Sequence, residues 1–277
     1  MPVTITGGIT FTGNGVTMEG APTGNTAGWF AGGASAPGQT STVQRITFAT
    51  DTATASVRGP LSSANSYRAG GAGNTTYGWY GGGNNPSLPV PSRAISSVDR
   101  ITYTTDTATA TARGYLSSSR YYLSATGNQN YGWYGPGLKT VGDASTVDRI
   151  TYATDTATAS SRGLLATSRS RYAATGNDNY GWFSGGSSLP GPIISSVDRI
   201  DYANDTATAS VRGPLASGVQ LFAASTDGTT YGWFGGGAPS NYSIVQRITY
   251  ATDTATATNR GNFSNGGANW AATSGIQ

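Results

Sequence analysis

The stretch of sequence that decides the fold is Val197-Asp198-Arg199-Ile200-Asp201-Tyr202-Ala203-Asn204-Asp205-Thr206-Ala207-Thr208-Ala209-Ser210-Val211. Its first part alternates apolar and polar residues, which is typical of a strand with two different faces. A short turn ending at Asp205 follows, and the threonines and alanines after it have small side chains and suit a second strand. We interpret the whole stretch as an antiparallel pair of strands.

This stretch occurs five times at intervals of about 50 residues. The arginines of its first strand are Arg45, Arg100, Arg149, Arg199 and Arg247. The aspartates that begin the following Asp-Thr-Ala-Thr-Ala are Asp51, Asp106, Asp155, Asp205 and Asp253. A Gly-Trp-aromatic motif precedes each copy, with Trp29, Trp79, Trp133, Trp182 and Trp233. A repeat of about this length with several strands per unit is typical of a propeller blade.

Each unit has room for four strands, as in the fourth unit at 171–175, 180–183, 196–202 and 206–211. The first unit lacks an initial strand, and the chain ends on an extra one, Trp270-Ala271-Ala272-Thr273. We therefore predict an all-β fold: a five-bladed β-propeller with four-stranded antiparallel blades, its ring closed by the C-terminal strand. The alternatives are an open solenoid or a sixth, partial blade built from residues 1–27.

The chain accordingly divides into the propeller, residues 28–277, and a non-repeating N-terminal segment, residues 1–27. The segment alternates apolar and polar residues around Ile5, Ile9 and Phe11 and contains turn-forming glycines. This pattern predicts small hairpins or a strand that attaches to another chain. An extra strand that caps the ring is the alternative.

The composition excludes most catalytic chemistry. The chain has no histidine and no cysteine, and only 10% of its residues are charged. It therefore lacks an imidazole base, a thiol nucleophile and the usual ligands of zinc. We expect no enzymatic activity, no cofactor and no metal site. The formal charge of +3, with arginines spread along the chain, predicts no nucleic-acid binding, and no apolar run is long enough for membrane insertion.

Two motifs resemble the kelch-repeat family: Trp182-Phe183-Ser184-Gly185-Gly186 and Ile200-Asp201-Tyr202-Ala203-Asn204-Asp205-Thr206. The resemblance covers residues 28–277 and implies a propeller that binds through one face of its ring without chemistry. The closely similar, glycine- and threonine-rich copies look like the kelch-like repeats of tail and virion proteins of bacterial viruses. The resemblance thus implies a virion or extracellular surface location, and we find no recognisable signal peptide.

The repeated polar residues are interpreted as structural. The five strand arginines are expected to form hydrogen bonds and ion pairs between blades, rather than a ring that binds anions. The five turn aspartates are expected to cap backbone amides, rather than to ligate calcium or act as a carboxylate pair. The five tryptophans are expected to pack in the core, rather than to form platforms for sugars.

The better binding candidates lie in the loops that differ between copies. The loops after the second and fourth strands of each unit emerge on the same face of the ring, and loops on a rigid scaffold commonly carry binding. The candidate binding residues are Asn84, Asn85, Arg93, Tyr115, Arg120, Lys139, Asp143, Arg169, Gln220, Asn241 and Tyr242.

The sequence thus predicts a non-enzymatic structural or adhesive interaction module of a virion, a tail or another extracellular surface. It is expected to join protein partners in a larger assembly through residues 1–27. The alternative is a propeller lectin that binds a cell-surface glycan through tyrosine, tryptophan, asparagine and aspartate at the loops.

Overall fold

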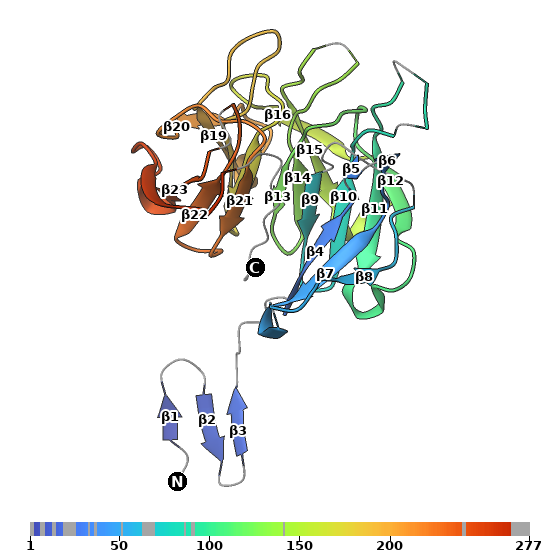
Figure 1. Ribbon diagram of the computed structural model, residues 1–277, viewed down its shortest axis with the longest axis vertical. Helices are drawn as coiled ribbons and strands as arrows, with labels where there is room; N and C mark the ends of the chain where they lie inside the picture. Colours follow the sequence, from blue (N-terminus) through green and yellow to red (C-terminus); the bar gives the residue numbers. More distant parts are fainter. Residues whose placement is uncertain are drawn as a thin grey trace.

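The fold is described from a computed structural model that covers residues 3–5, 9–12, 15–18, 26–32, 34–35, 38–50, 52–62, 70–85, 87–89, 92–140, 142–239 and 242–266. Figure 1 shows the strands grouped into blades that follow one another around a ring. The prediction of an all-β fold with five blades of antiparallel strands is confirmed.

Four blades have four described strands each, named a to d in chain order. Blade 2 contains β9 (Gly70–Gly73), β10 (Tyr77–Gly81), β11 (Ser97–Thr102) and β12 (Thr111–Tyr115). Blade 3 contains β13 (Ala125–Gly127), β14 (Tyr131–Tyr134), β15 (Thr146–Thr151) and β16 (Ser160–Leu164). Blade 4 contains β17 (Ala173–Gly176), β18 (Tyr180–Ser184), β19 (Val197–Asp201) and β20 (Ser210–Arg212). Blade 5 contains β21 (Ala223–Thr226), β22 (Tyr231–Gly235), β23 (Ile244–Thr249) and β24 (Thr258–Asn262).

Blade 1 has strands b, c and d, which are β4 (Ala27–Ala31), β7 (Val43–Thr47) and β8 (Ser56–Arg58). The two short strands β5 (Ala34–Ser35) and β6 (Gly38–Gln39) pair within its b–c loop. The strand predicted to complete this blade, Trp270 to Thr273, lies outside the described residues, and so does the ring closure that it was predicted to make.

Strand c of each blade runs into one turn of 3-10 helix before strand d. These turns are η1 (Phe48–Thr50), η2 (Tyr103–Thr105), η3 (Tyr152–Thr154), η4 (Tyr202–Asn204) and η5 (Tyr250–Thr252). The a strands of neighbouring blades contact one another, which makes them the innermost strands of the ring. Their small residues, such as Gly71 and Ala125, allow the sheets to converge.

The N-terminal segment forms its own antiparallel sheet of β1 (Val3–Ile5), β2 (Ile9–Thr12) and β3 (Gly15–Met18). In its register Val3 pairs with Phe11, and Ile9 pairs with Met18. Within the described part of the chain, none of these three strands pairs with a blade strand.

Aromatic stacking joins each blade to the next. The indole of Trp133 in blade 3 stacks on the Tyr202 ring of blade 4, with 3.7 Å between the ring centroids and 3° between the planes. Trp79 stacks in the same way on Tyr152, at 3.8 Å. Trp79, Trp133 and Trp182 are fully buried. The prediction that the repeated tryptophans pack in the core is confirmed for these three.

One carboxylate lies at the centre of each of these interfaces. Oδ2 of Asp205 in blade 4 accepts hydrogen bonds from Trp133 Nε1, at 2.8 Å, and from an Arg149 terminal nitrogen, at 3.0 Å, both in blade 3. Nε of Arg162, also in blade 3, lies 3.6 Å from the same oxygen. The same contacts recur at the other interfaces, and we call the four carboxylates the joining aspartates: Asp106, Asp155, Asp205 and Asp253.

These contacts settle two predictions. Ion pairing between blades is confirmed for Arg45, Arg100, Arg149 and Arg199. The prediction that the aspartate side chains cap their own turns is wrong for the four joining aspartates, because their carboxylates bond to the preceding blade. Arg247 lies over the Tyr231 ring, at 3.9 Å from its centroid, as Arg100, Arg149 and Arg199 lie over the equivalent tyrosines. Asp51 lies outside the described residues.

Close backbone contact requires glycine beside each joining aspartate. The Gly163 N–H donates to the Asp205 carbonyl oxygen at 2.7 Å. A Cβ at this glycine would lie 1.9 Å from the Ala207 carbonyl oxygen, much closer than atoms can approach. This explains the glycine of the recurring Arg-Gly pair, because the outer strand must lie directly against the next blade.

We expect Asp205→Ala to destabilise the protein by about 3–5 kcal/mol, because it leaves Arg149, Arg162 and Trp133 without their common acceptor. Urea unfolding followed by tryptophan fluorescence measures the loss. Asp201→Ala is the matched control, since Asp201 is exposed and its side chain accepts only from the Ala203 N–H. Equal losses in the two variants would contradict the joining role.

Burial raises the pKa of seven tyrosine hydroxyls above the ordinary value of about 10. The residues are Tyr80, Tyr103, Tyr134, Tyr152, Tyr172, Tyr202 and Tyr250. For Tyr250, desolvation raises the pKa to about 12. The folded state therefore holds these phenols in the neutral form over a pH range in which the unfolded chain loses their protons.

This difference predicts steep alkaline unfolding. The stabilisation is fully present below pH ~10, and each buried tyrosine removes roughly 1.4 kcal/mol per pH unit as the pH rises from there towards its folded pKa. We expect tyrosinate absorbance and the loss of circular dichroism to appear in one cooperative transition above pH ~10. Ionisation of all the tyrosines near pH 10 with an unchanged dichroism spectrum would show that they are solvated.

Candidate binding face

The b–c loops and the d–a connections meet at one end of the ring, which we call the loop face. Antiparallel bridges join the two sets of loops at Tyr121 with Leu138, at Ser170 with Ser187, and at Gln220 with Ala238. Figure 1 shows these long loops along the upper edge of the ring. The a–b and c–d turns lie at the opposite end, which we call the turn face.

Several predicted binding residues lie on the loop face with accessible side chains. Arg93 is exposed, and its Nε donates to the Leu88 carbonyl oxygen at 3.3 Å. Tyr115 is 57% exposed at the end of β12. Lys139 is half-buried in the b–c loop of blade 3. These side chains come from two different blades.

Other predicted residues shape the loops themselves. The Asn85 side chain accepts from the Ser87 N–H at 3.0 Å, and Asn84 is buried in a bridge with Ala94. Asp143 Oδ2 accepts from the Leu189 N–H at 2.6 Å, which links the b–c loops of blades 3 and 4.

Gln220 and Tyr242 lie in the loops of the last two blades. Gln220 is half-buried in its bridge with Ala238, and Tyr242 packs on the core of blades 4 and 5. Asn241 lies outside the described residues.

Arg120 and Arg169 do not lie on the surface, and their prediction as binding residues is corrected by their complete burial. Arg169 donates to Asp198 Oδ2 at 2.9 Å and to the Ser196 carbonyl oxygen at 3.0 Å. Arg120 pairs with Asp148 in the equivalent position one blade earlier. Each arginine therefore ties a d–a connection to strand c of the next blade.

Burial opposes both charges of the Arg169–Asp198 pair. Desolvation lowers the pKa of the Arg169 guanidinium and raises the pKa of the Asp198 carboxyl. One blade later the same two positions hold Val219 and Gln246, both buried. Gln246 Oε1 accepts from the Ala216 N–H at 2.6 Å, as Asp198 accepts from the Ala166 N–H at 2.9 Å. In blades 3, 4 and 5, charge is thus present at both positions or at neither. Blade 2 has a buried aspartate at this position of strand c, Asp99, which accepts from the Ser62 N–H and from the Ser62 hydroxyl.

Sequence reasoning missed a set of strained residues beside the innermost strands. Tyr122, Arg171 and Leu221 have φ values of 57°, 61° and 58°, in the left-handed region that disfavours side chains. The Arg171 N–H donates to the Tyr122 carbonyl oxygen, and the Leu221 N–H to the Arg171 carbonyl oxygen. The Arg171 guanidinium lies 4.8 Å from the centroid of the Tyr122 ring. These residues add a cation and an aromatic ring to the inner edge of the loop face.

Among the described residues, no group of three or more histidines, cysteines, aspartates or glutamates could hold a metal ion. The same part of the chain has no helix long and apolar enough to cross a membrane.

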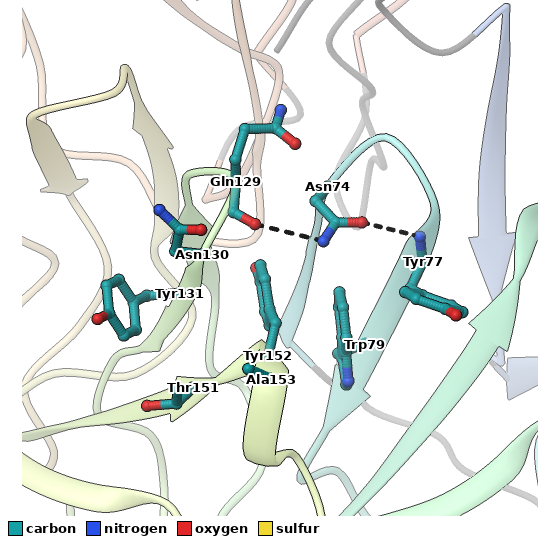
Figure 2. A pocket seen from close by; sticks show the side chains of 9 residues that line it. All are labelled: Asn74, Tyr77, Trp79, Gln129, Asn130, Tyr131, Thr151, Tyr152 and Ala153. Atoms are coloured by element: carbon teal, nitrogen blue, oxygen red, sulfur yellow. Dashed lines mark hydrogen bonds between the residues drawn. The ribbon is translucent and has the colours of Figure 1, made fainter.

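A pocket of about 370 Å³ lies on the turn face between blades 2 and 3. It is lined by Asn74, Tyr77, Trp79, Gln129, Asn130, Tyr131, Thr151, Tyr152 and Ala153. Figure 2 shows the indole and the Tyr152 ring side by side at its centre, with Tyr77 and Tyr131 on either side. The amide of Asn74 crosses between the blades and donates to the Gln129 carbonyl oxygen at 3.3 Å.

The Val219 and Gln246 pair suggests a double-mutant cycle. Arg169→Val alone leaves Asp198 buried without its cation, and Asp198→Gln alone leaves the guanidinium without its anion. We expect each single change to cost about 3–5 kcal/mol. Arg169→Val with Asp198→Gln should recover more than half of that loss, because blade 5 already accommodates these two residues. Additive losses in urea unfolding would show that the pair is not coupled.

No family model matches the chain, and no curated protein matches it. A solved structure titled "Structure of YjhT" matches with a TM-score of 0.70 over 91% of this chain and 87% of that chain. The two sequences are 10% identical, so the likeness concerns the fold alone. The comparisons and the described geometry together establish a β-propeller, and kelch membership is not shown by them.

Proposed function

We propose that this protein is a non-enzymatic interaction module that binds its partner through the loop face, with a structural or adhesive role on a virion, a tail or another extracellular surface. One observation carries the proposal. The polar residues that the blades share are used between blades, whereas the b–c loops and d–a connections, which differ from blade to blade, meet on the loop face. Loops that vary in sequence on a rigid scaffold commonly carry the binding site for a partner.

The same observation argues against catalysis. Each joining aspartate accepts from an indole and an arginine and is buried, so it has no open side for a reacting group. Asp148 and Asp198 are fully buried in their arginine pairs. A general acid or base must reach the proton that it transfers, and these carboxylates are enclosed by their partners.

The N-terminal sheet supports attachment to an assembly. Its three strands have only three or four residues each, and a sheet of this size needs an apolar face packed against other groups for stability in water. Pairing with a strand of a neighbouring chain would extend the sheet and supply its missing contacts. We therefore assign attachment to residues 1–27 and recognition to the loop face.

The proposal is tested on particles from cells that produce the chain. Mass spectrometry of purified virions, tails or filaments is expected to find the chain as a stoichiometric component. Deletion of residues 1–27 is expected to leave the dichroism of the propeller unchanged and to abolish cosedimentation with the particles. The double variant Arg93→Ala with Lys139→Ala tests the loop face. This variant should still cosediment with the particles, but adhesion of the particles to their target surface should be weaker.

Two results would overturn the assignment. Absence of the chain from every particle fraction would remove the structural role. Full cosedimentation of the shortened chain would place attachment on the propeller rather than on residues 1–27.

A further inference from the structure

The pocket between blades 2 and 3 has a chemical character of its own. Two half-buried tyrosines, Tyr77 and Tyr131, flank the stacked rings of Trp79 and Tyr152. Three amide side chains, Thr151 and Ala153 form the rest of the lining, and no charged side chain belongs to it. The volume of about 370 Å³ falls within the range of small-molecule sites, roughly 300–1,000 Å³.

The rim of this pocket carries polar groups that the fold does not use. The Asn130 main chain is held by the Asn128 side chain, and the Asn130 side chain itself is exposed. Thr151 precedes a 3-10 turn but makes no capping hydrogen bond with its side chain. Within the described part of the chain, neither of these two side chains has a hydrogen-bond partner.

A buried hydroxyl at the same pocket is also without a partner. Within the residues that the structure describes, Tyr152 Oη is buried and has no hydrogen-bond partner. Its counterpart in blade 4, Tyr202, bonds to the Thr126 hydroxyl at 3.0 Å, and the blade 3 tyrosine differs because Ala72 stands at the position of Thr126. Figure 2 shows the hydroxyl end of Tyr152 directed towards the Asn74–Gln129 hydrogen bond.

We propose that this pocket binds one residue of a neutral saccharide. A pyranose ring presents C–H groups on its faces, which suit the negative faces of aromatic rings, and hydroxyls at its edge, which suit amides and hydroxyls. Trp79 and Tyr152 are buried against each other, so the ring surface that a sugar can reach is that of the half-buried Tyr77 and Tyr131, beside the exposed amides of Gln129 and Asn130. The guanidinium groups of Arg100 and Arg149 lie on the Tyr77 and Tyr131 rings, 4.3 and 4.5 Å from the ring centroids, but they are paired with Asp155 and Asp205 and do not belong to the lining. The site lies on the turn face and does not rest on the function proposed for the loop face.

The interface between blades 3 and 4 lacks this neutral character. In blade 4 the positions of Gln129 and Thr151 are occupied by Asp178 and Asp201. Asp201 uses its carboxylate to accept from the Ala203 N–H at 3.0 Å. The strands and the shared contacts of the repeat are the same at both interfaces. The two interfaces differ at positions whose residue type these contacts do not restrict.

The test is saturation-transfer NMR on the full chain with named sugars. The neutral probes are the methyl glycosides of glucose, galactose, mannose and N-acetylglucosamine, and the acidic probes are glucuronate and galacturonate. We expect transfer from the aromatic protons to at least one neutral probe and none to the acidic probes. Titration of that probe against tryptophan fluorescence then gives its dissociation constant.

A pair of matched variants locates the site. Gln129→Ala with Asn130→Ala removes two exposed rim side chains and one long hydrogen bond from the Thr75 N–H to Gln129 Oε1, at 3.4 Å. The bonds of the Asn130 N–H and of the Gln129 carbonyl oxygen are kept, so we expect the fold to be preserved. We expect this variant to weaken binding at least tenfold. Asp178→Ala with Asn179→Ala makes the equivalent change in blade 4 and should leave the dissociation constant unchanged. A circular dichroism melt of both variants confirms that they are folded.

The proposal is overturned by any of three results. These are no transfer to the four neutral probes, stronger transfer to the acidic probes, or equal weakening by the two matched variants. The loop-face variant, Arg93→Ala with Lys139→Ala, tests only the function proposed for the loop face, and the sugar titration tests only the pocket. The two proposals can therefore fail separately.

Discussion

The hydrogen bonds at the joining aspartates are the constraint on which the rest of the structure depends. Each carboxylate, at 6–7% exposure, takes an indole N–H and a guanidinium from the preceding blade. A buried carboxylate is costly unless it is paired, so this position fixes the tryptophan, both arginines and the close glycine together. The stacked Trp–Tyr pairs then supply apolar contact in a chain with few large aliphatic residues.

The blades could be predicted from the sequence because their signals are local and repeated. Alternation in Val197-Asp198-Arg199-Ile200 and the recurring period are both visible without any partner. The role of Asp205 was not visible, because its indole donor lies 72 residues earlier in the chain. In a sequence, an aspartate in a turn is typical of a local cap. The structure shows that the Asp205 carboxylate bonds to the preceding blade instead.

Burial determines which loop residues can contact a partner, and burial cannot be measured directly from the sequence. Arg120 and Arg169 occur in only two of the loops, which made them resemble variable surface residues. In blade 5 the partner changes as well, since Val219 is accompanied by Gln246 rather than by an aspartate. The left-handed residues Tyr122, Arg171 and Leu221 share no residue type, so no composition signal could have identified their common backbone conformation.

A propeller of near-identical blades can vary only where the blade interface does not restrict the residue. The joining aspartate, its tryptophan and its arginines are restricted at each described interface, which leaves the loop face and the rims of the turn face. Gln129 against Asp178 is such a difference, because the capping asparagine beside it, Asn128 or Asn177, is kept. The interactions that hold the ring together therefore also determine where recognition can evolve, and they confine it to the two ends of the ring.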